Sequence, residues 1–303
     1  MQLEEFEKGW IAVGNRVKGI ALVILSAVIF GVTPTMVKYT YSHGSNPVVM
    51  TMFRSLLPIP IILAVLAAQK ISLKIPIRLF GKIGVIALVG STATTIMLNM
   101  SYHYIPVGMA TTLHFVYPTF VSLLCFFFYR ERIDRAKILA LVISSSGILC
   151  FFQGNGSGSI AGILLALGSG LTYAFYMVSV DKWGVKNLHP MVFSFYTCLF
   201  VSIDTFIYGA LTHQITFGLS GLSWIYTFIV AVSVSVGANA FLQMGIRDTG
   251  ASTAAILSMF EPITSVICGV LILHESLSGL KLLGCVLILF AVYLLTRKRA
   301  VVE

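Results

Sequence analysis

The chain has 303 residues, of which 57% are hydrophobic and only 10% are charged. An ordinary soluble domain has roughly 25% charged residues, so this composition excludes that class and indicates a membrane protein. The net charge of +9 does not indicate a nucleic-acid partner, because most basic residues lie in short connections between apolar runs, where they face anionic lipid.

Ten apolar stretches follow one another along the chain. A helix needs about 20 residues to cross a hydrocarbon layer of about 30 Å. The stretches are continuously apolar rather than alternating, which favours helices over strands. The prediction is an all-α protein with ten transmembrane helices, multi-pass in the cytoplasmic membrane of a prokaryote. The expected spans lie near 19–41, 47–69, 83–100, 106–128, 136–153, 160–180, 190–211, 222–245, 251–273 and 279–296.

Lys and Arg gather at alternate connections, which is the positive-inside pattern. It predicts that both termini are cytoplasmic, with a cytoplasmic segment at 1–18 and a basic cytoplasmic tail at 297–303. The first segment lacks the apolar core and cleavage site of a secretory signal. All five cysteines fall inside apolar spans without metal-ligand spacing, and no phosphate-binding loop motif occurs, so we expect neither metal nor cofactor.

The chain also contains an internal repeat. A shift of 144 aligns Leu98 with Leu242, Pro118 with Pro262 and Glu131 with Glu275. Two five-span halves, 19–153 and 160–296, are therefore expected around a linker at 154–159. Because five is odd, the second half enters the membrane from the opposite face, and such inverted repeats are typical of secondary transporters that bind substrate at mid-membrane between the halves.

These features resemble the drug/metabolite transporter superfamily in its EamA-like branch, over essentially the whole chain. The resemblance depends on the doubled five-span plan, the proline motifs "FVYPTF" and "FEPITS", the acids in "YRERI" and "LHESL", and Arg54. It implies a secondary transporter, in most members an exporter, with a cavity lined by the first, third, fourth, sixth, eighth and ninth spans. It names no substrate.

Glu261 is the first candidate for function. A carboxylate at the centre of a membrane helix costs about 2.5 to 3.5 kcal/mol, so it must face a cavity or a partner. Pro262 removes a backbone donor and frees the carbonyl of Ser258, which shares a face with Glu261. Glu261 could carry a proton or bind a cationic substrate. The alternative is a packing acid satisfied by Arg54 or a nearby hydroxyl.

The first half carries a matching face. His114 and Tyr117 are three residues apart, and Pro118 frees the carbonyl of His114. A histidine changes charge near neutral pH, so His114 is a candidate partner of Glu261 in a proton relay. It could equally be a neutral packing residue.

Polar and aromatic side chains elsewhere supply further candidates for substrate binding. Asn99 matches Gln243 in the repeat, and Asn239 lies one turn before Gln243. Amides can fix a polar ligand or hold helices together. Tyr173 and Tyr176 could form an aromatic wall for an aromatic or quaternary-ammonium ligand, or simply pack.

Several remaining residues favour structural or gating roles. Arg54 is expected to pair with a backbone carbonyl or an acid rather than to bind substrate. Pro34, Pro118 and Pro262 are expected to kink their helices. Lys38 and Asp181 can snorkel to the interface. Glu131 and Glu275 are expected to cap helices or pair with bases. Asp204 has no evident partner.

The function predicted is secondary active transport of a small polar or amphipathic metabolite, of amino-acid or organic-cation type, coupled to protons and directed outward. Its partners are then the substrate, protons and membrane lipids; the sequence does not fix the oligomeric state and is compatible with a monomer. An importer or exchanger of a choline-like cation or nucleobase is the alternative. An intramembrane lipid-modifying enzyme is disfavoured because no H-E-x-x-H or other catalytic constellation occurs, and a channel because no rings of like charge occur.

The predicted topology can be tested by chemical labelling. A cysteine at Ser157 in the linker should react with a membrane-impermeant maleimide applied outside the cell, whereas one at Lys74, in a basic connection, should not. Reversed accessibility of the two sites would refute the orientation.

Overall fold

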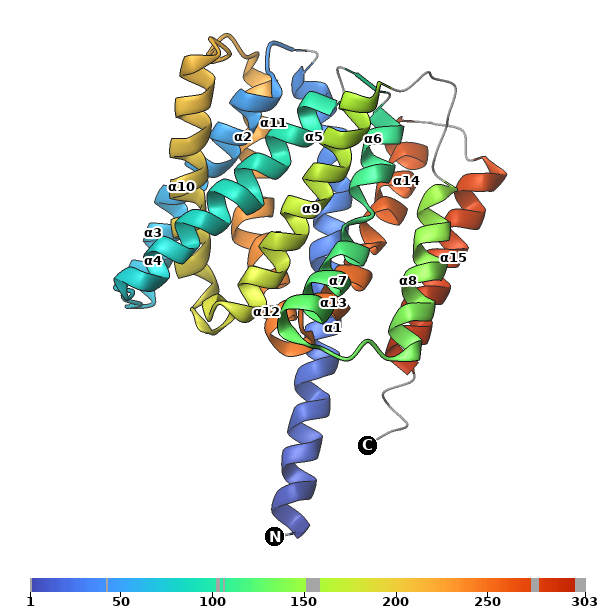
Figure 1. The fold of residues 1–303 in the computed structure, drawn as a ribbon. Helices are drawn as coiled ribbons and strands as arrows, with labels where there is room; N and C mark the ends of the chain where they lie inside the picture. The colour runs from blue at the N-terminus through green and yellow to red at the C-terminus, as the bar shows by residue number, and fades with distance from the viewer. Residues whose placement is uncertain are drawn as a thin grey trace.

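The computed structural model describes residues 2–41, 43–101, 104–105, 107–150, 159–273 and 278–297. Every element in these ranges is a helix, and the helices stand side by side in one bundle (Figure 1). The first half contains α1 (Gln2–Tyr41), α2 (Pro47–Leu56), α3 (Pro58–Ala68), α4 (Ile77–Val85), the π-helix η1 (Ile86–Thr92), α5 (Ala93–Ser101), α6 (Val107–His114), α7 (Tyr117–Tyr129) and α8 (Arg135–Leu149).

The second half follows the same plan. It contains α9 (Ile160–Lys182), a 3-10 turn η2 (Val185–Asn187), α10 (Pro190–Leu211), α11 (Gly221–Val232), the π-helix η3 (Ser233–Ala238), α12 (Asn239–Thr249), α13 (Ala251–Ser258), α14 (Phe260–Leu273) and α15 (Gly279–Arg297). The prediction of an all-α membrane protein is confirmed, since eight helical stretches in the described residues are long and apolar enough to cross a membrane.

The remaining two expected spans correspond to α8 and α15. They pack along each other at one edge of the bundle (Figure 1). At the other end of the chain, α1 begins at Gln2, so the expected segment 1–18 continues the first helix rather than preceding it. Most of the expected linker, residues 154–158, lies outside the described residues.

The two halves exchange partners in a symmetric way. α1 packs against α12 and α14 of the second half, and α9 packs against α5 and α7 of the first. The second spans, α2 and α10, pack on each other, as do α8 and α15. In Figure 1 α1 runs upward from the N-terminus while α9 runs downward. Exchanging the halves therefore leaves the packing pattern unchanged, as expected for an inverted repeat.

The proline motifs interrupt the fourth span of each half at equivalent residues. α6 ends at His114 and α13 ends at Ser258, 144 residues later. Proline lacks an N–H and its ring displaces the carbonyl four residues earlier, so Pro118 and Pro262 prevent a continuous helix there. The third spans are also irregular at matching places, where η1 and η3 each insert a π-helix. Such π-bulges are frequent at functional sites.

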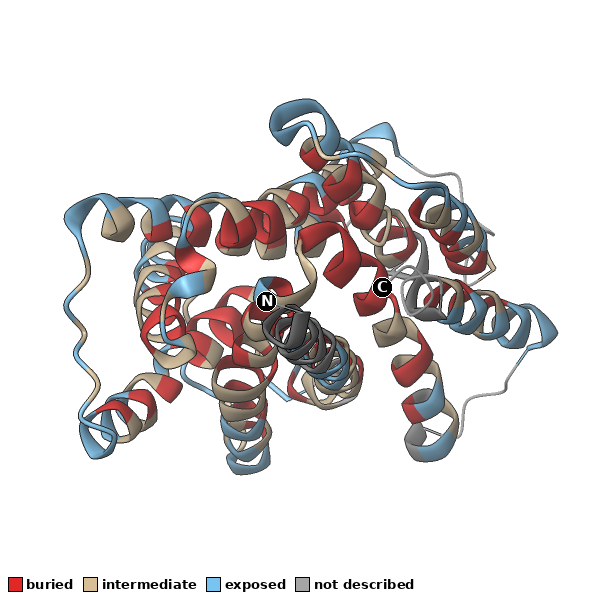
Figure 2. Ribbon diagram, turned by 90° about the horizontal axis from the view of Figure 1, so that it is seen from below, coloured by how far each residue is buried: buried red, intermediate tan, exposed pale blue. Residues whose placement is uncertain are grey.

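The basic connections lie together on one face. The α3–α4, α7–α8 and α9–α10 connections are on the same side of the bundle as the start of α1 and the end of α15 (Figure 1). Seen from that side, buried residues fill the middle and exposed residues cover the outer faces (Figure 2). Large apolar side chains such as Phe127 and Phe128 are among the exposed ones, which is the pattern of a bundle surrounded by lipid.

Two glycines allow helices to approach the interrupted spans closely. A Cβ atom added to Gly31 of α1 would lie 2.5 Å from the carbonyl oxygen of Glu261. One added to Gly170 of α9 would lie 2.8 Å from the carbonyl oxygen of His114. Each half thus places a glycine of its first helix against the backbone of the other half's break, and small residues at such contacts are typical of membrane helix packing.

This packing predicts that Gly31→Ala lowers stability. The new methyl group has no space beside Glu261, and overpacking costs about 1 to 3 kcal/mol. Thermal unfolding of the purified protein in detergent measures the effect. Gly81→Ala is the matched control, because nothing lies within 4 Å of its added Cβ. Equal unfolding temperatures for the two variants would contradict the close approach.

Candidate functional site

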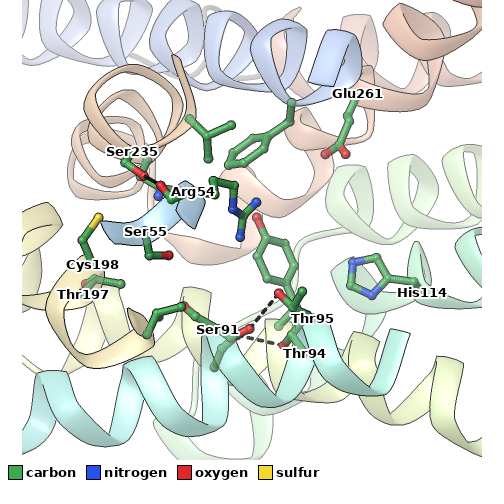
Figure 3. Close-up of a pocket in the computed structure, with 16 residues that line it drawn as sticks. Arg54, Ser55, Ser91, Thr94, Thr95, His114, Thr197, Cys198, Ser235 and Glu261 are labelled. Atoms are coloured by element: carbon green, nitrogen blue, oxygen red, sulfur yellow. Dashed lines mark hydrogen bonds between the residues drawn. The ribbon is translucent and has the colours of Figure 1, made fainter. Parts of the chain in front are cut away.

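A cavity of about 170 Å³ lies inside the bundle and is bounded by both halves. Figure 3 shows hydroxyl, guanidinium, imidazole and carboxylate groups directed into it. It is lined by Phe30, Arg54, Ser55, Gly90, Ser91, Thr94, Thr95, His114, Tyr173, Thr197, Cys198, Val201, Val234, Ser235, Asn239 and Glu261. Four of the predicted binding residues, Glu261, His114, Asn239 and Tyr173, are therefore brought together.

Glu261 reaches this cavity from the first turn of α14, directly after the break. Its carboxylate forms no hydrogen bond or ion pair with the residues that the structure describes, and Figure 3 shows it directed toward the cavity. Because no described residue satisfies this carboxylate, it depends on whatever occupies the cavity. Water, a proton or a cationic ligand can satisfy it there.

His114 enters the cavity at the end of α6. Its Nδ1 lies 2.9 Å from the hydroxyl of Ser169, which itself donates to the carbonyl of Ala166 at 2.6 Å. A serine hydroxyl has one hydrogen, and a carbonyl can only accept, so the Nδ1 of His114 must donate to Ser169. The neutral ring then carries no hydrogen on Nε2, which is left as a proton acceptor.

Aromatic rings form the wall beside His114. The rings of His114 and Tyr173 are 5.6 Å apart, and Tyr173 meets Tyr117 edge-on at 4.8 Å. Tyr176 stacks on Tyr173 with ring centroids 5.8 Å apart. Tyr173 is the one of the three tyrosines that lines the cavity; Tyr117 and Tyr176 lie behind it and are buried. The aromatic wall exists, but only its front ring can reach a ligand.

Arg54 differs most from its predicted role. Its guanidinium points into the middle of the cavity (Figure 3). Within the described part of the chain it has no carboxylate in ion-pair range, so the expected pairing with an acid is not found. Its backbone carbonyl accepts a hydrogen bond from the hydroxyl of Ser235 at 3.2 Å. The cavity thus holds a guanidinium and a carboxyl group that form no direct ion pair with each other.

The second and seventh spans were not expected at the cavity. α2 contributes Arg54 and Ser55, and α10 contributes Thr197, Cys198 and Val201. The hydroxyls of Ser91, Thr94 and Ser235 lie in small-residue strings that sequence reasoning would assign to helix packing. No signal in the sequence separates them from packing residues; in the structure they lie on the π-helices or directly after them.

Comparison with known proteins identifies the family of this chain. The model of the EamA-like transporter family matches residues 17–153 and again 160–297. The chain belongs to this family. The two matched segments are the two halves described above, so the predicted repeat is confirmed as that of an EamA-like membrane transporter.

Relatives of this EamA-like chain occur in bacteria and archaea. It is 28% identical over 67% of its length to an uncharacterized transporter of Synechocystis, of which it spans 63%. It is 24% identical to an uncharacterized transporter of Clostridium kluyveri, with 90% of this chain and 91% of the relative covered. A crystal structure titled only "Crystal structure of protein" has the same fold, with a TM-score of 0.76 at 17% identity over 94% of this chain and 98% of that one.

The three amide residues predicted to bind substrate in this EamA-like protein lie in three different environments. Asn239 lines the cavity. Gln243, one turn later and 2% exposed, instead donates its amide hydrogens to the carbonyls of Val185 at 3.0 Å and Leu188 at 3.2 Å. It holds the α9–α10 connection. Asn99 lines a neighbouring hollow of about 70 Å³, which shares Thr95 with the cavity and reaches Pro47 and Gln214 at helix ends.

The other predicted residues surround the site without entering it. Ser258 is buried at the end of α13, outside the lining. Pro118 and Pro262 stand at the two breaks, as described above. α1 continues through Pro34, so no break occurs there. The side chains of Pro34 and Lys38, and Glu275 as a whole, lie outside the described residues.

An ionic cluster lies at the face of the bundle that bears the basic connections. Asp181 is 3% exposed, and its carboxylate pairs with Lys182 at 2.9 Å and Lys186 at 2.7 Å. Lys182 also pairs with Glu131 from the end of α7. Asp181 therefore does not snorkel to the interface, because salt bridges to these two lysines hold it, whereas Glu131 pairs with a base as predicted. Together with Gln243, the cluster joins α7, α9, η2 and α12.

The contrast between the two amides predicts opposite stability effects. Gln243→Leu removes two buried hydrogen bonds, each worth about 0.5 to 1.5 kcal/mol, so the unfolding temperature in detergent should fall. Asn239→Leu removes an amide that faces the cavity and should lower it much less. A larger fall for the Asn239 variant would show that their assigned roles are reversed.

Proposed function

We propose that the protein is a secondary active transporter that moves a small polar metabolite of amino-acid type across the cytoplasmic membrane of a prokaryote. It works by alternating access, takes up protons in exchange and exports its substrate. The observation that carries this proposal is a cavity between two inverted halves that contains one carboxylate and one guanidinium, each without an ionic partner among the described residues.

The size and lining of the cavity support a small ligand. Its volume of about 170 Å³ is below the roughly 300 Å³ at which drug-sized sites begin. Hydroxyls and the Asn239 amide line much of it, so a polar ligand finds hydrogen-bond partners. The front ring of Tyr173 adds one apolar surface.

The opposite charges of Arg54 and Glu261 favour an amino acid over an organic cation. A zwitterion carries a carboxylate that a guanidinium binds in a bidentate manner and an ammonium that a carboxylate binds. A choline-like cation would satisfy Glu261 but leave Arg54 with a like charge nearby, which is unfavourable. The amino-acid class is therefore preferred to the choline and nucleobase alternatives.

Proton coupling is supported by two proton acceptors at the same cavity. Glu261 has no fixed partner in the described part of the chain, and His114 presents Nε2 as an acceptor because Ser169 holds its Nδ1 hydrogen. When substrate leaves on the outer side, protons can replace the ammonium at Glu261. Release of those protons inside would return the empty carrier. The direction of export is taken from the family resemblance and from this exchange.

This proposal predicts that Glu261→Gln separates coupling from binding. In proteoliposomes, transport of amino acids driven by an imposed pH gradient should be abolished, because a glutamine side chain cannot take up and release a proton. Exchange of labelled for unlabelled substrate across the membrane should persist in part. Asp248→Asn, at the far end of α12, is a control acid that should leave both activities intact. Undiminished gradient-driven flux in Glu261→Gln would reject proton coupling through this residue.

A further inference from the structure

Another hollow lies on the outside of the bundle, between α10 and the third span. Its volume is about 460 Å³, and its walls include Leu88, Val89, Ile207 and Leu211. Leu88 and Ile207 are each 53% exposed, and both belong to stretches that can cross a membrane. This groove therefore opens toward lipid rather than toward the central cavity.

One carboxylate lies in this otherwise apolar groove. Asp204 is seven residues before the end of α10, about 10 Å along the axis at 1.5 Å per residue, and thus well below the helix end. In the described part of the chain its one hydrogen-bond partner is Thr92 of η1, at 3.3 Å from Oδ2. One hydroxyl does not neutralise a carboxylate, so a charge at this depth calls for a cation.

Tyr208 stands beside it on the same face. It lies four residues after Asp204 on α10 and lines the same groove. A carboxylate flanked by an aromatic ring is the combination that recognises an ammonium group, since the ring face attracts the cation while the acid pairs with it. The apolar walls beyond these two residues suit a hydrocarbon chain.

The groove and the central cavity are separate but share their walls. Ser91 faces the cavity while the next residue, Thr92, faces the groove. On α10, Val201 lines the cavity and Asp204 the groove. A ligand held at Asp204 would therefore lie against the same helices that shape the transport site, without entering it.

From this arrangement we infer that the groove is a membrane-facing binding site for an amphipathic amine. The ammonium pairs with Asp204 beside the ring of Tyr208, and the alkyl chain extends along Leu88 and Val89, toward the middle of the membrane. The occupant reaches the site through the lipid. The site is independent of Glu261 and goes beyond the proposed transport of small polar metabolites.

Photolabelling tests this site. The protein in lipid nanodiscs is irradiated with a dodecylamine that carries a diazirine at the end of its chain, and labelled peptides are identified by mass spectrometry. Labels are expected on η1 and α10. Unmodified dodecylamine should compete for them, whereas dodecanol, which has the same chain without the charge, should not. Equal competition by both would overturn the assignment of a cation site.

Variants then assign the charge. Asp204→Asn should reduce labelling about tenfold, which corresponds to about 1.4 kcal/mol of lost binding, and Asp204→Glu should restore part of it. Glu261→Gln and Asp248→Asn should leave labelling unchanged. Thermal unfolding identifies any variant that misfolds, and the competition in the unmodified protein does not depend on variants. Unchanged labelling in Asp204→Asn, or its loss in Glu261→Gln, would overturn the proposal.

Discussion

A charged side chain inside a bilayer must meet water, a ligand or an opposite charge, and this constraint governs the arrangement of the bundle. Arg54 and Glu261 satisfy it by facing a common cavity, which no pair of helices could enclose alone. Eight spans contribute to the lining. The helices that bury these two charges are therefore also the helices that build the site, and stability and ligand binding depend on the same contacts.

The two proline breaks make this arrangement possible. By ending α6 at His114 and α13 at Ser258, they expose backbone and side-chain polar groups at equivalent depths in the two halves. Irregular backbone at membrane depth is tolerated only where it borders a cavity or other protein. Gly31 and Gly170 allow other protein to cover the breaks, since each lets the first helix of one half pack against the break in the other half. The polar site therefore sits where both breaks can be covered.

Much of this fold follows from the sequence. Apolar length gives the spans, the 144-residue shift gives the two halves, and the prolines give the breaks, because each depends on local chemistry that a single segment carries. Glu261, His114, Tyr173 and Asn239 could be identified as cavity residues for the same reason: polar groups in apolar helices must face inward.

Packing between distant segments could not be predicted in this way. Asn239 and Gln243 are one turn apart and look alike in sequence, yet only the structure shows that the α9–α10 connection lies within reach of Gln243. Arg54 was expected to pair with a carbonyl or an acid, but its side chain lines the cavity. Asp181 could snorkel from its helix end to the membrane interface, but it forms ion pairs with Lys182 and Lys186 instead. Each outcome depends on which element lies opposite, and spacing along one helix does not contain that information.

The two π-helices have a mechanical consequence. Each is a stretch in which one more residue is wound into the turn than an α-helix holds. Rewinding such a turn to α-helical geometry would slide the register of the chain beyond it by one position, which rotates every following side chain by about 100°. For η1 this would swing Thr94 and Thr95 around the axis of α5, and for η3 it would do the same to Asn239. The lining of the cavity can thus be altered by twisting two helices in place, without tilting any of them.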